Sequence, residues 1–229
     1  MLISLCDSDE TRFSDLIEAA PSCMPRDRER ILNWAQENVG EIRHEKNLAW
    51  NTLRRVLNKH KLYPDANWAL RGEELYPLEQ LYNQLQPDDV QARYMYLFNE
   101  DLNYEVLKPS SITLSYRELS HDSIVGLKAT ARERAVKELV EELGLERVLE
   151  LRLEVKYPWY LGEALAKVIK DEKDLQSVWL CLEDDAPHIA FAHGFISQKL
   201  RCEELSWIQT LVQELLEKGY SDKAVANAL

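Results

Sequence analysis

Histidine and acidic side chains late in the chain are the first residues to consider for metal or acid–base chemistry. His188 and His193 are five positions apart, so they lie on different faces of a helix instead of forming the i, i+4 pair of a zinc-binding helix. The run Glu183, Asp184 and Asp185 stands before a proline, a pattern more typical of a solvated turn. Catalytic carboxylates need unlike environments, and the sequence indicates none for this run. We therefore expect no metal site and no catalytic pair here.

The cysteines and glycines do not indicate an enzyme either. Cys6, Cys23, Cys181 and Cys202 include no C-x-x-C pair, so the spacing of a zinc knuckle is absent. The chain has seven glycines, with no phosphate-binding G-x-x-x-x-G-K-[ST] loop and no G-x-S-x-G nucleophile elbow. The sequence therefore predicts a protein with no cofactor and no enzymatic site of its own.

A cluster of basic and aromatic residues is the best candidate for binding. Its cations lie in the last turns of a helix expected over residues 41–61 and are Arg54, Arg55, Lys59 and Lys61; its aromatic residues, Tyr63 and Trp68, lie just beyond that helix. The helix dipole alone explains cations at a helix C-terminus. The functional alternative is a docking patch for an acidic partner or for a nucleic-acid backbone.

Two further aromatic residues, Trp159 and Tyr160, stand at the start of an expected helix. Such rings either pack beneath a neighbouring loop or serve as interface anchors. The candidate interaction residues are therefore Arg54, Arg55, Trp68, Trp159 and Tyr160.

Composition narrows the classes of partner. The 229 residues include 40 acidic and 28 basic side chains, for a net charge of −12. A free-standing nucleic-acid or anionic-membrane binder normally shows a basic field, so we expect neither partner. No apolar stretch approaches the length of a membrane span. Irregularly spaced cysteines and the lack of a secretory leader favour a cytoplasmic protein with reduced thiols.

The segments that carry these candidate residues are predicted to be helices. Leu145, Leu175 and Leu205 each open an amphipathic segment at intervals of 30 residues, and Pro158 and Pro187 begin segments 29 residues apart. A two-helix unit that restarts at this interval is typical of a helical solenoid. The sequence predicts an all-α fold: an α-solenoid of antiparallel helix pairs with a repeat of about 30 residues and no significant sheet.

The same patterns predict the domain organisation. We expect an N-terminal helical region over residues 1–105, a connecting segment over 106–126 and a helical-repeat region over 127–229. Residues 221–229 match the first helix of a repeat whose second helix is missing. The repeat region is thus a candidate for truncation at its C-terminus.

Several short sequence segments resemble those of a known class of proteins. They are residues 50–54 (WNTLR), 60–70 (HKLYPDANWAL), 85–89 (LQPDD), 96–98 (YLF), 157–165 (YPWYLGEAL) and 191–196 (FAHGFI). They resemble the helical-repeat region of large bacterial multidomain proteins, which often carry a P-loop ATPase of the STAND type and in some cases are linked to phage defence. The resemblance covers about residues 45–229. It implies a sensing or scaffolding arm whose concave surface meets a partner protein, and it carries over no catalytic residue.

Together these features favour a non-enzymatic scaffold or sensor segment that mediates protein–protein interaction within a larger bacterial protein. Its partners would be other proteins or other domains of the same parent. The alternative is a regulatory segment of an ATP-dependent, STAND-like enzyme whose catalytic domain lies elsewhere. A stand-alone hydrolase with an unrecognised site is a third reading, and it would require a pocket with convergent polar groups.

Overall fold

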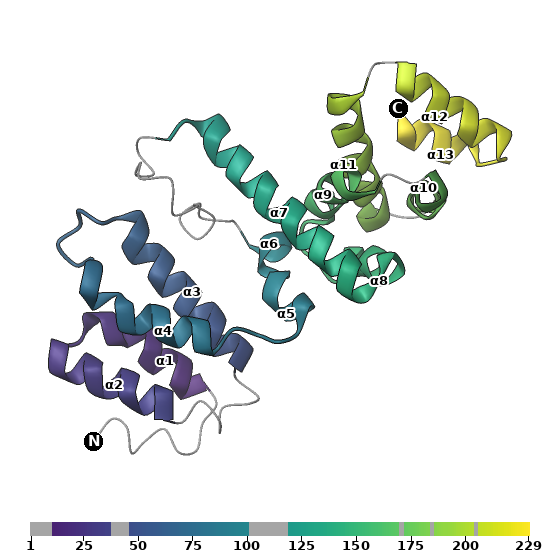
Figure 1. Ribbon diagram of the computed structural model, residues 1–229. Helices are drawn as coiled ribbons and strands as arrows, with labels where there is room; N and C mark the ends of the chain where they lie inside the picture. Colours follow the sequence, from purple (N-terminus) through teal and green to yellow (C-terminus); the bar gives the residue numbers. More distant parts are fainter. Residues whose placement is uncertain (1–10, 38–45, 101–118, 170–171, 184–185, 204–205) are drawn as a thin grey trace. The chain divides into compact units, whose positions relative to one another are not determined.

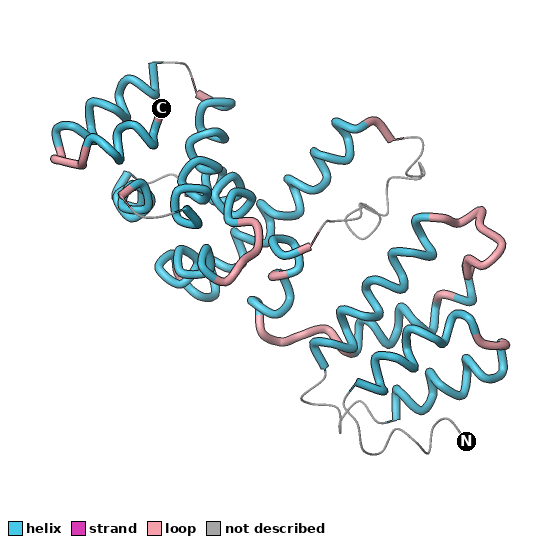
Figure 2. Tube along the Cα trace, turned by 180° about the vertical axis from the view of Figure 1, so that it is seen from behind, coloured by secondary structure: helices cyan, strands magenta, loops and turns pink. Residues whose placement is uncertain are grey.

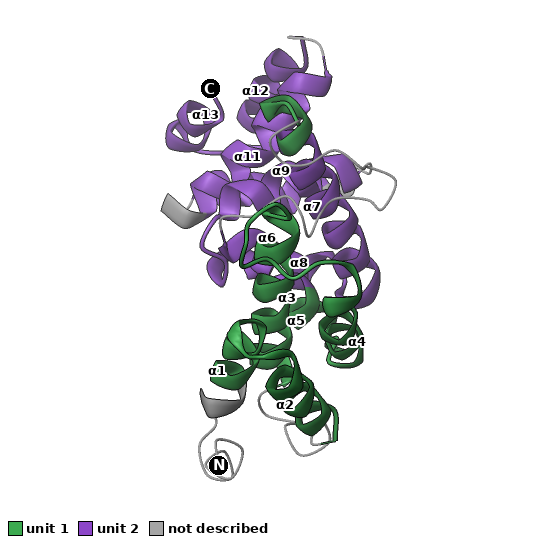
Figure 3. Ribbon diagram, turned by 90° about the vertical axis from the view of Figure 1, so that its left-hand side faces the viewer, with its two compact units in different colours: residues 1–93, 103–124 green, residues 94–102, 125–229 purple. Residues whose placement is uncertain are grey.

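The computed structural model describes residues 11–37, 46–100, 119–169, 172–183, 186–203 and 206–229. Across these residues every regular element is a helix, and Figure 2 shows no strand among them. The predicted all-α class is confirmed. The chain divides into two compact units, drawn in different colours in Figure 3: the first comprises Met1–Arg93 and Asn103–Ile124, and the second comprises Tyr94–Leu102 and Val125–Leu229.

The described part of the first unit contains four main helices. Figure 1 shows these helices, α1 to α4, running alongside one another. The elements are α1 (Thr11–Ala19), the 3-10 turn η2 (Ala20–Ser22), α2 (Pro25–Glu37), α3 (Lys46–Leu62), the 3-10 turn η3 (Gly72–Glu74), α4 (Tyr76–Gln84) and α5 (Val90–Tyr94), which ends at the unit boundary. Apolar side chains fill the space between them, and Ile17, Leu53, Leu78 and Leu81 are fully buried.

Helix α3 packs against both α1 and α4. Its buried face includes Ala49, Leu53, Val56 and His60, which recur every three or four positions as one face of a helix requires. The helix ends at Leu62, close to the predicted end, since Pro64 disfavours helical geometry at the residue before it.

The second unit contains the residues in which the sequence indicated a repeat. Its elements are α6 (Tyr96–Asn99), most of α7 (His121–Leu143), α8 (Leu145–Glu150), the 3-10 turn η6 (Leu151–Leu153), α9 (Pro158–Val168), α10 (Glu172–Trp179), the 3-10 turn η7 (Leu180–Leu182), α11 (Ala186–Cys202), α12 (Ser206–Glu217) and α13 (Asp222–Ala228). Gly144, between α7 and α8, has φ of 83°, a left-handed conformation that favours glycine at a helix end.

Burial in the second unit follows the predicted spacing in part. Leu151, Cys181 and Leu211 recur every 30 residues and are all buried, and Val148 and Val178 are fully buried at the same interval. Helices α8 and α10 each continue into a 3-10 turn, whereas α12 does not. The starts of α9, α11 and α13, at residues 158, 186 and 222, are unevenly spaced. The pattern of buried positions therefore recurs, while the lengths of the helices do not, since α9 has 11 residues and α11 has 17.

Helices α9 and α11 approach each other at two glycines. A Cβ placed on Gly162 would lie 2.0 Å from the carbonyl oxygen of Phe191, and one on Gly194 would lie 2.1 Å from the carbonyl oxygen of Trp159. Beside this crossing, the fully buried rings of Trp179 and Phe195 meet edge to face with centroids 5.7 Å apart. The core of the second unit is thus organised around the α9–α11 pair.

The division into units differs from the predicted boundary at residue 105. Helix α6 belongs to the second unit, because the Leu97 carbonyl accepts a hydrogen bond from Nε of Arg132 at 3.0 Å and the Phe98 carbonyl accepts one from the Tyr157 amide at 3.0 Å. Much of the predicted connecting segment, 106–118, lies outside the described residues. Its remainder is helical from His121 onward as the start of α7.

Candidate functional site

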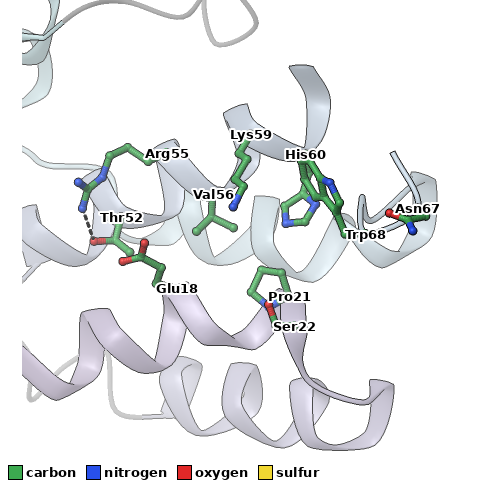
Figure 4. A pocket seen from close by; sticks show the side chains of 10 residues that line it. All are labelled: Glu18, Pro21, Ser22, Thr52, Arg55, Val56, Lys59, His60, Asn67 and Trp68. Atoms are coloured by element: carbon green, nitrogen blue, oxygen red, sulfur yellow. Dashed lines mark hydrogen bonds between the residues drawn. The ribbon is translucent and has the colours of Figure 1, made fainter. Parts of the chain in front are cut away.

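An open pocket in the first unit lies between the C-terminal half of α3 and the end of α1 (Figure 4). It encloses about 810 Å³, a volume within the usual range of ligand pockets. Its lining comes from α3 (Thr52, Arg55, Val56, Lys59, His60), from α1 and η2 (Glu18, Pro21, Ser22) and from the loop after α3 (Asn67, Trp68). We call it the α3 pocket.

The α3 pocket follows from the periodicity of α3. Thr52, Arg55, Val56 and Lys59 are spaced three, four and seven positions from the first, so they lie on one face of the helix. Sequence reasoning identified Arg55 and Lys59 from their charge but missed Thr52, Val56 and the buried His60 as their neighbours. The i, i+3, i+4, i+7 spacing was the signal that could have found them.

The two adjacent arginines predicted as interaction residues have different positions. Arg54 is only 4% exposed, and its Nε donates to Oδ1 of Asn51 at 3.3 Å. Arg55 is exposed, lines the pocket and donates to the hydroxyl of Thr52 at 3.4 Å. Consecutive residues of a helix point about 100° apart, and in this pair Arg55 lines the pocket whereas Arg54 does not. Arg55 is therefore the more accessible of the two arginines, and a role for either one in binding stays a prediction.

The two lysines of the predicted basic cluster are also in different environments. Nζ of Lys61 lies 2.7 Å from a carboxylate oxygen of Glu79, so its charge is paired. Nζ of Lys59 lies 5.2 Å from the ring centroid of Trp68, within the range of a cation–π contact. The cations that line the pocket are therefore Arg55 and Lys59.

Trp68, another predicted interaction residue, stands at the mouth of the α3 pocket and is 46% exposed. Its ring meets those of Tyr63 and His60 edge to face, with centroids 6.1 and 5.4 Å apart. Tyr63 is itself 44% exposed. The structure thus brings Arg55 and Trp68 together at one pocket, as expected from the basic and aromatic cluster.

His60 is the most deeply buried charged or titratable group of the pocket, with an exposed fraction of 5%. Its Nδ1 accepts a hydrogen bond from the Leu70 amide at 3.0 Å, so the neutral ring carries its proton on Nε2. Burial lowers the pKa of His60 below its ordinary value, and the nearby charges of Lys59 and Arg28 lower it further. The imidazole therefore presents an N–H donor at neutral pH.

Trp159 and Tyr160 lie in the second unit, where both contribute to packing. The carbonyl of Trp159 faces Gly194, and the guanidinium of Arg132 lies over the Tyr160 ring, 3.6 Å from its centroid. Both side chains are half-buried. Their role at an interface stays a prediction.

Of the residues first considered for metal or acid–base chemistry, Asp184 and Asp185 lie outside the described residues, and the other three have protein partners. Nδ1 of His188 accepts from Nε of Arg152 at 2.9 Å, and Nε2 of His193 lies 2.6 Å from the carbonyl oxygen of Asn227. Glu183 accepts from the amide of Ser221 at 2.7 Å, at the start of α13. Within the part of the chain that the structure describes, no three His, Cys, Asp or Glu side chains are grouped to hold a metal ion.

Comparison of the chain with models of protein families gave no match, and neither curated proteins nor solved structures gave one. Among the described residues, no helix combines the length and apolar character needed to cross a membrane. The residues of the α3 pocket are therefore the basis for the function proposed below.

Proposed function

We propose that this chain is a non-enzymatic scaffold or sensor segment that mediates protein–protein contact, and that a partner docks at the α3 pocket and its rim. The observation that carries the proposal is Trp68, which stands 46% exposed at the mouth of a pocket that also presents Arg55. Trp, Tyr and Arg are the residue types that dominate the binding energy of protein interfaces.

The aromatic rim is preorganised for such a contact. Lys59 lies over the ring of Trp68, and the rings of Tyr63 and His60 meet that ring edge to face. The exposed indole therefore has neighbours on several sides. A side chain held in place loses less conformational entropy on binding than one that moves freely. The rim therefore supplies a large contact area at low entropic cost.

The proposal includes a solenoid arrangement for the second unit. It is supported by the burial of Leu151, Cys181 and Leu211 at 30-residue intervals and by the packing of α9 against both α11 and η6. In a helical solenoid each helix pair buries its apolar face on its neighbours, which gives this kind of recurrence.

We also propose that the chain acts within a larger, cytoplasmic bacterial protein, as its resemblance to the repeat regions of STAND-associated proteins implies. Three cysteines among the described residues, Cys23, Cys181 and Cys202, are free thiols, in keeping with a reducing compartment. The partner would then be another protein or another domain of the same parent.

Site-specific photo-crosslinking tests the docking surface directly. A photoreactive phenylalanine analogue replaces Trp68 in the full chain, and in a matched control it replaces Tyr76, which is 58% exposed in the same unit but lies outside the pocket. We expect a discrete protein adduct from position 68 in cells and a much weaker one from position 76. Equal labelling from the two positions, or no protein adduct from position 68, would overturn the proposal.

A further inference from the structure

Resting on the proposed function, we infer that the α3 pocket binds an acidic peptide segment of the protein partner. A carboxylate of that segment would lie between Arg55, Lys59 and the Nε2–H of His60. The inference depends on three features of the pocket: its local charge, its buried donor and its mixed polarity.

The local charge of the pocket is opposite in sign to that of the whole chain. Arg55 and Lys59 line it together with one carboxylate, that of Glu18, whereas the chain carries a net charge of −12. Among the residues that the structure describes, Arg55 donates to the neutral hydroxyl of Thr52, and Lys59 contacts the ring of Trp68. Neither cation is paired with a carboxylate among the described residues, so both remain available to an incoming anion.

The buried donor of the pocket is the Nε2–H of His60. The residue is only 5% exposed. Figure 4 shows its side chain among those that line the pocket. Nδ1 is occupied by the Leu70 amide, and within the described part of the chain Nε2 has no hydrogen-bond acceptor. Nε2 is not one of the fully buried polar atoms, so it keeps accessible surface. A carboxylate oxygen that enters the pocket could therefore accept a hydrogen bond from the Nε2–H group.

The mixed polarity of the lining favours a peptide over a nucleic acid. Glu18 would repel a phosphodiester backbone, which has no N–H group to offer it. A peptide offers backbone N–H groups that can donate to Glu18 while its acidic side chain meets the cations. Pro21, Val56 and Trp68 add apolar surface for the neighbouring side chains of the same segment. Nucleic-acid binding, moreover, depends on many phosphate contacts, and this pocket supplies two cations.

A displayed library of random 12-residue peptides, selected on the full 229-residue chain, tests the inference. We expect enrichment of sequences with Asp or Glu beside an apolar residue. The best peptide is then synthesised, together with a copy in which its acidic residue is changed to the amide, and both are titrated against the chain. We expect the amide copy to bind about tenfold more weakly, because it loses the charge-assisted contacts.

Two double variants serve as the matched pair. Arg55→Glu with Lys59→Glu reverses the charge of both cations in the pocket. Arg134→Glu with Lys137→Glu makes the same charge change on the exposed face of α7. We expect the first to weaken binding of the best peptide about tenfold and the second to change it less than about twofold. Arg55→Gln with Lys59→Gln, which removes the charges without reversing them, replaces the first variant if circular dichroism shows a loss of helix.

Three outcomes would overturn the inference. They are the absence of any enriched peptide, enrichment without acidic residues, and equal binding to both double variants. Fluorescent 12-nucleotide DNA and RNA strands form the competing arm: pocket-dependent binding of these strands with no acidic peptide enriched would assign the pocket to nucleic acid. The proposed function fails separately, on the crosslinking result at position 68, so a protein adduct without acidic preference would overturn only the present inference.

Discussion

Gly162 of α9 lies so close to the carbonyl oxygen of Phe191 in α11 that a Cβ at this position would be 2.0 Å from that oxygen. Gly194 makes the reciprocal approach to the carbonyl of Trp159 at 2.1 Å. Both obstacles are backbone atoms within helices, so no change of rotamer can relieve them. The two helices can cross at this distance only because both positions lack a side chain.

This geometry predicts that Gly162→Ala and Gly194→Ala each destabilise the protein. Alanine is favoured over glycine in a helix by about 1 kcal/mol, but overpacking against rigid neighbours costs about 1–3 kcal/mol or more, so the collision decides the sign. Gly126→Ala in α7 is the matched control, because nothing lies within 4 Å of its Cβ. It should stabilise the protein by up to about 1 kcal/mol. Urea unfolding of the full chain measures all three, and equal stability of Gly162→Ala and Gly126→Ala would contradict this account.

His60 predicts a loss of stability at mildly acidic pH. Burial, together with Lys59 and Arg28, lowers the pKa of His60 in the folded protein below its ordinary value of 6.5. As pH falls below 6.5, the unfolded chain takes up the proton before the folded chain does. The free energy of unfolding should therefore be at its full value above this pH and decrease below it, by at most about 1.4 kcal/mol per pH unit for one proton.

The His60→Asn variant isolates this effect, because the asparagine carbonyl can replace Nδ1 as acceptor for the Leu70 amide and does not titrate. Urea unfolding at several pH values between 7.5 and 5.5 should show a steeper decrease for the wild type than for the variant. Parallel curves for the two proteins would show that His60 is not the titrating group.

Arg54 and Arg55 should respond in opposite ways to substitution by alanine. Arg54 is buried and bonded to Asn51, so Arg54→Ala should destabilise the first unit by about 1–3 kcal/mol. Arg55 is exposed, so Arg55→Ala should change stability by less than about 0.5 kcal/mol while reducing the crosslink yield at position 68. If a fully folded Arg54→Ala protein lost crosslinking and Arg55→Ala did not, Arg54 and not Arg55 would be the residue that contacts the partner.

The contact between Glu183 and Ser221 is expected to stabilise the start of α13. The Glu183 carboxylate accepts from the amide and the hydroxyl of Ser221, and these hydrogen bonds lower the pKa of Glu183 below its ordinary value. The contribution to stability is therefore present at neutral pH and is lost as pH falls through the lowered pKa. Glu183→Gln should accelerate amide hydrogen exchange in residues 222–228, whereas Glu203→Gln, on an exposed side chain, should not. Unchanged exchange in the first variant would mean that the contact does not hold the helix.

Much of the fold could be predicted because it depends on local patterns. Apolar spacing predicts the helical class, and Pro158 begins a helix as the sequence predicts. Trp50 and Trp179 lie within helical segments of the sequence and are buried. Leu48, in contrast, is 45% exposed, because the buried stripe of α3 runs through Ala49 and Leu53 instead.

The features that sequence reasoning missed depend on contacts between distant segments. Nothing local in α6 reveals that its carbonyls accept from Arg132 and Tyr157, which join it to the second unit. The choice of Arg55 over Arg54 depends on the rotation of α3 relative to α1, which charge alone does not encode. The role of His60 likewise depends on the Leu70 amide, ten residues further along the chain.

Hydroxyl-radical footprinting of the wild-type chain, alone and in non-covalent complex with the partner that crosslinking identifies, tests the central claim most directly. Oxidation of Trp68 and Tyr63 is measured by mass spectrometry, with Tyr76 as the exposed reference in the same unit. The account predicts that the partner protects Trp68 and Tyr63 strongly and leaves Tyr76 as reactive as before. Undiminished oxidation of Trp68 in the complex would contradict it.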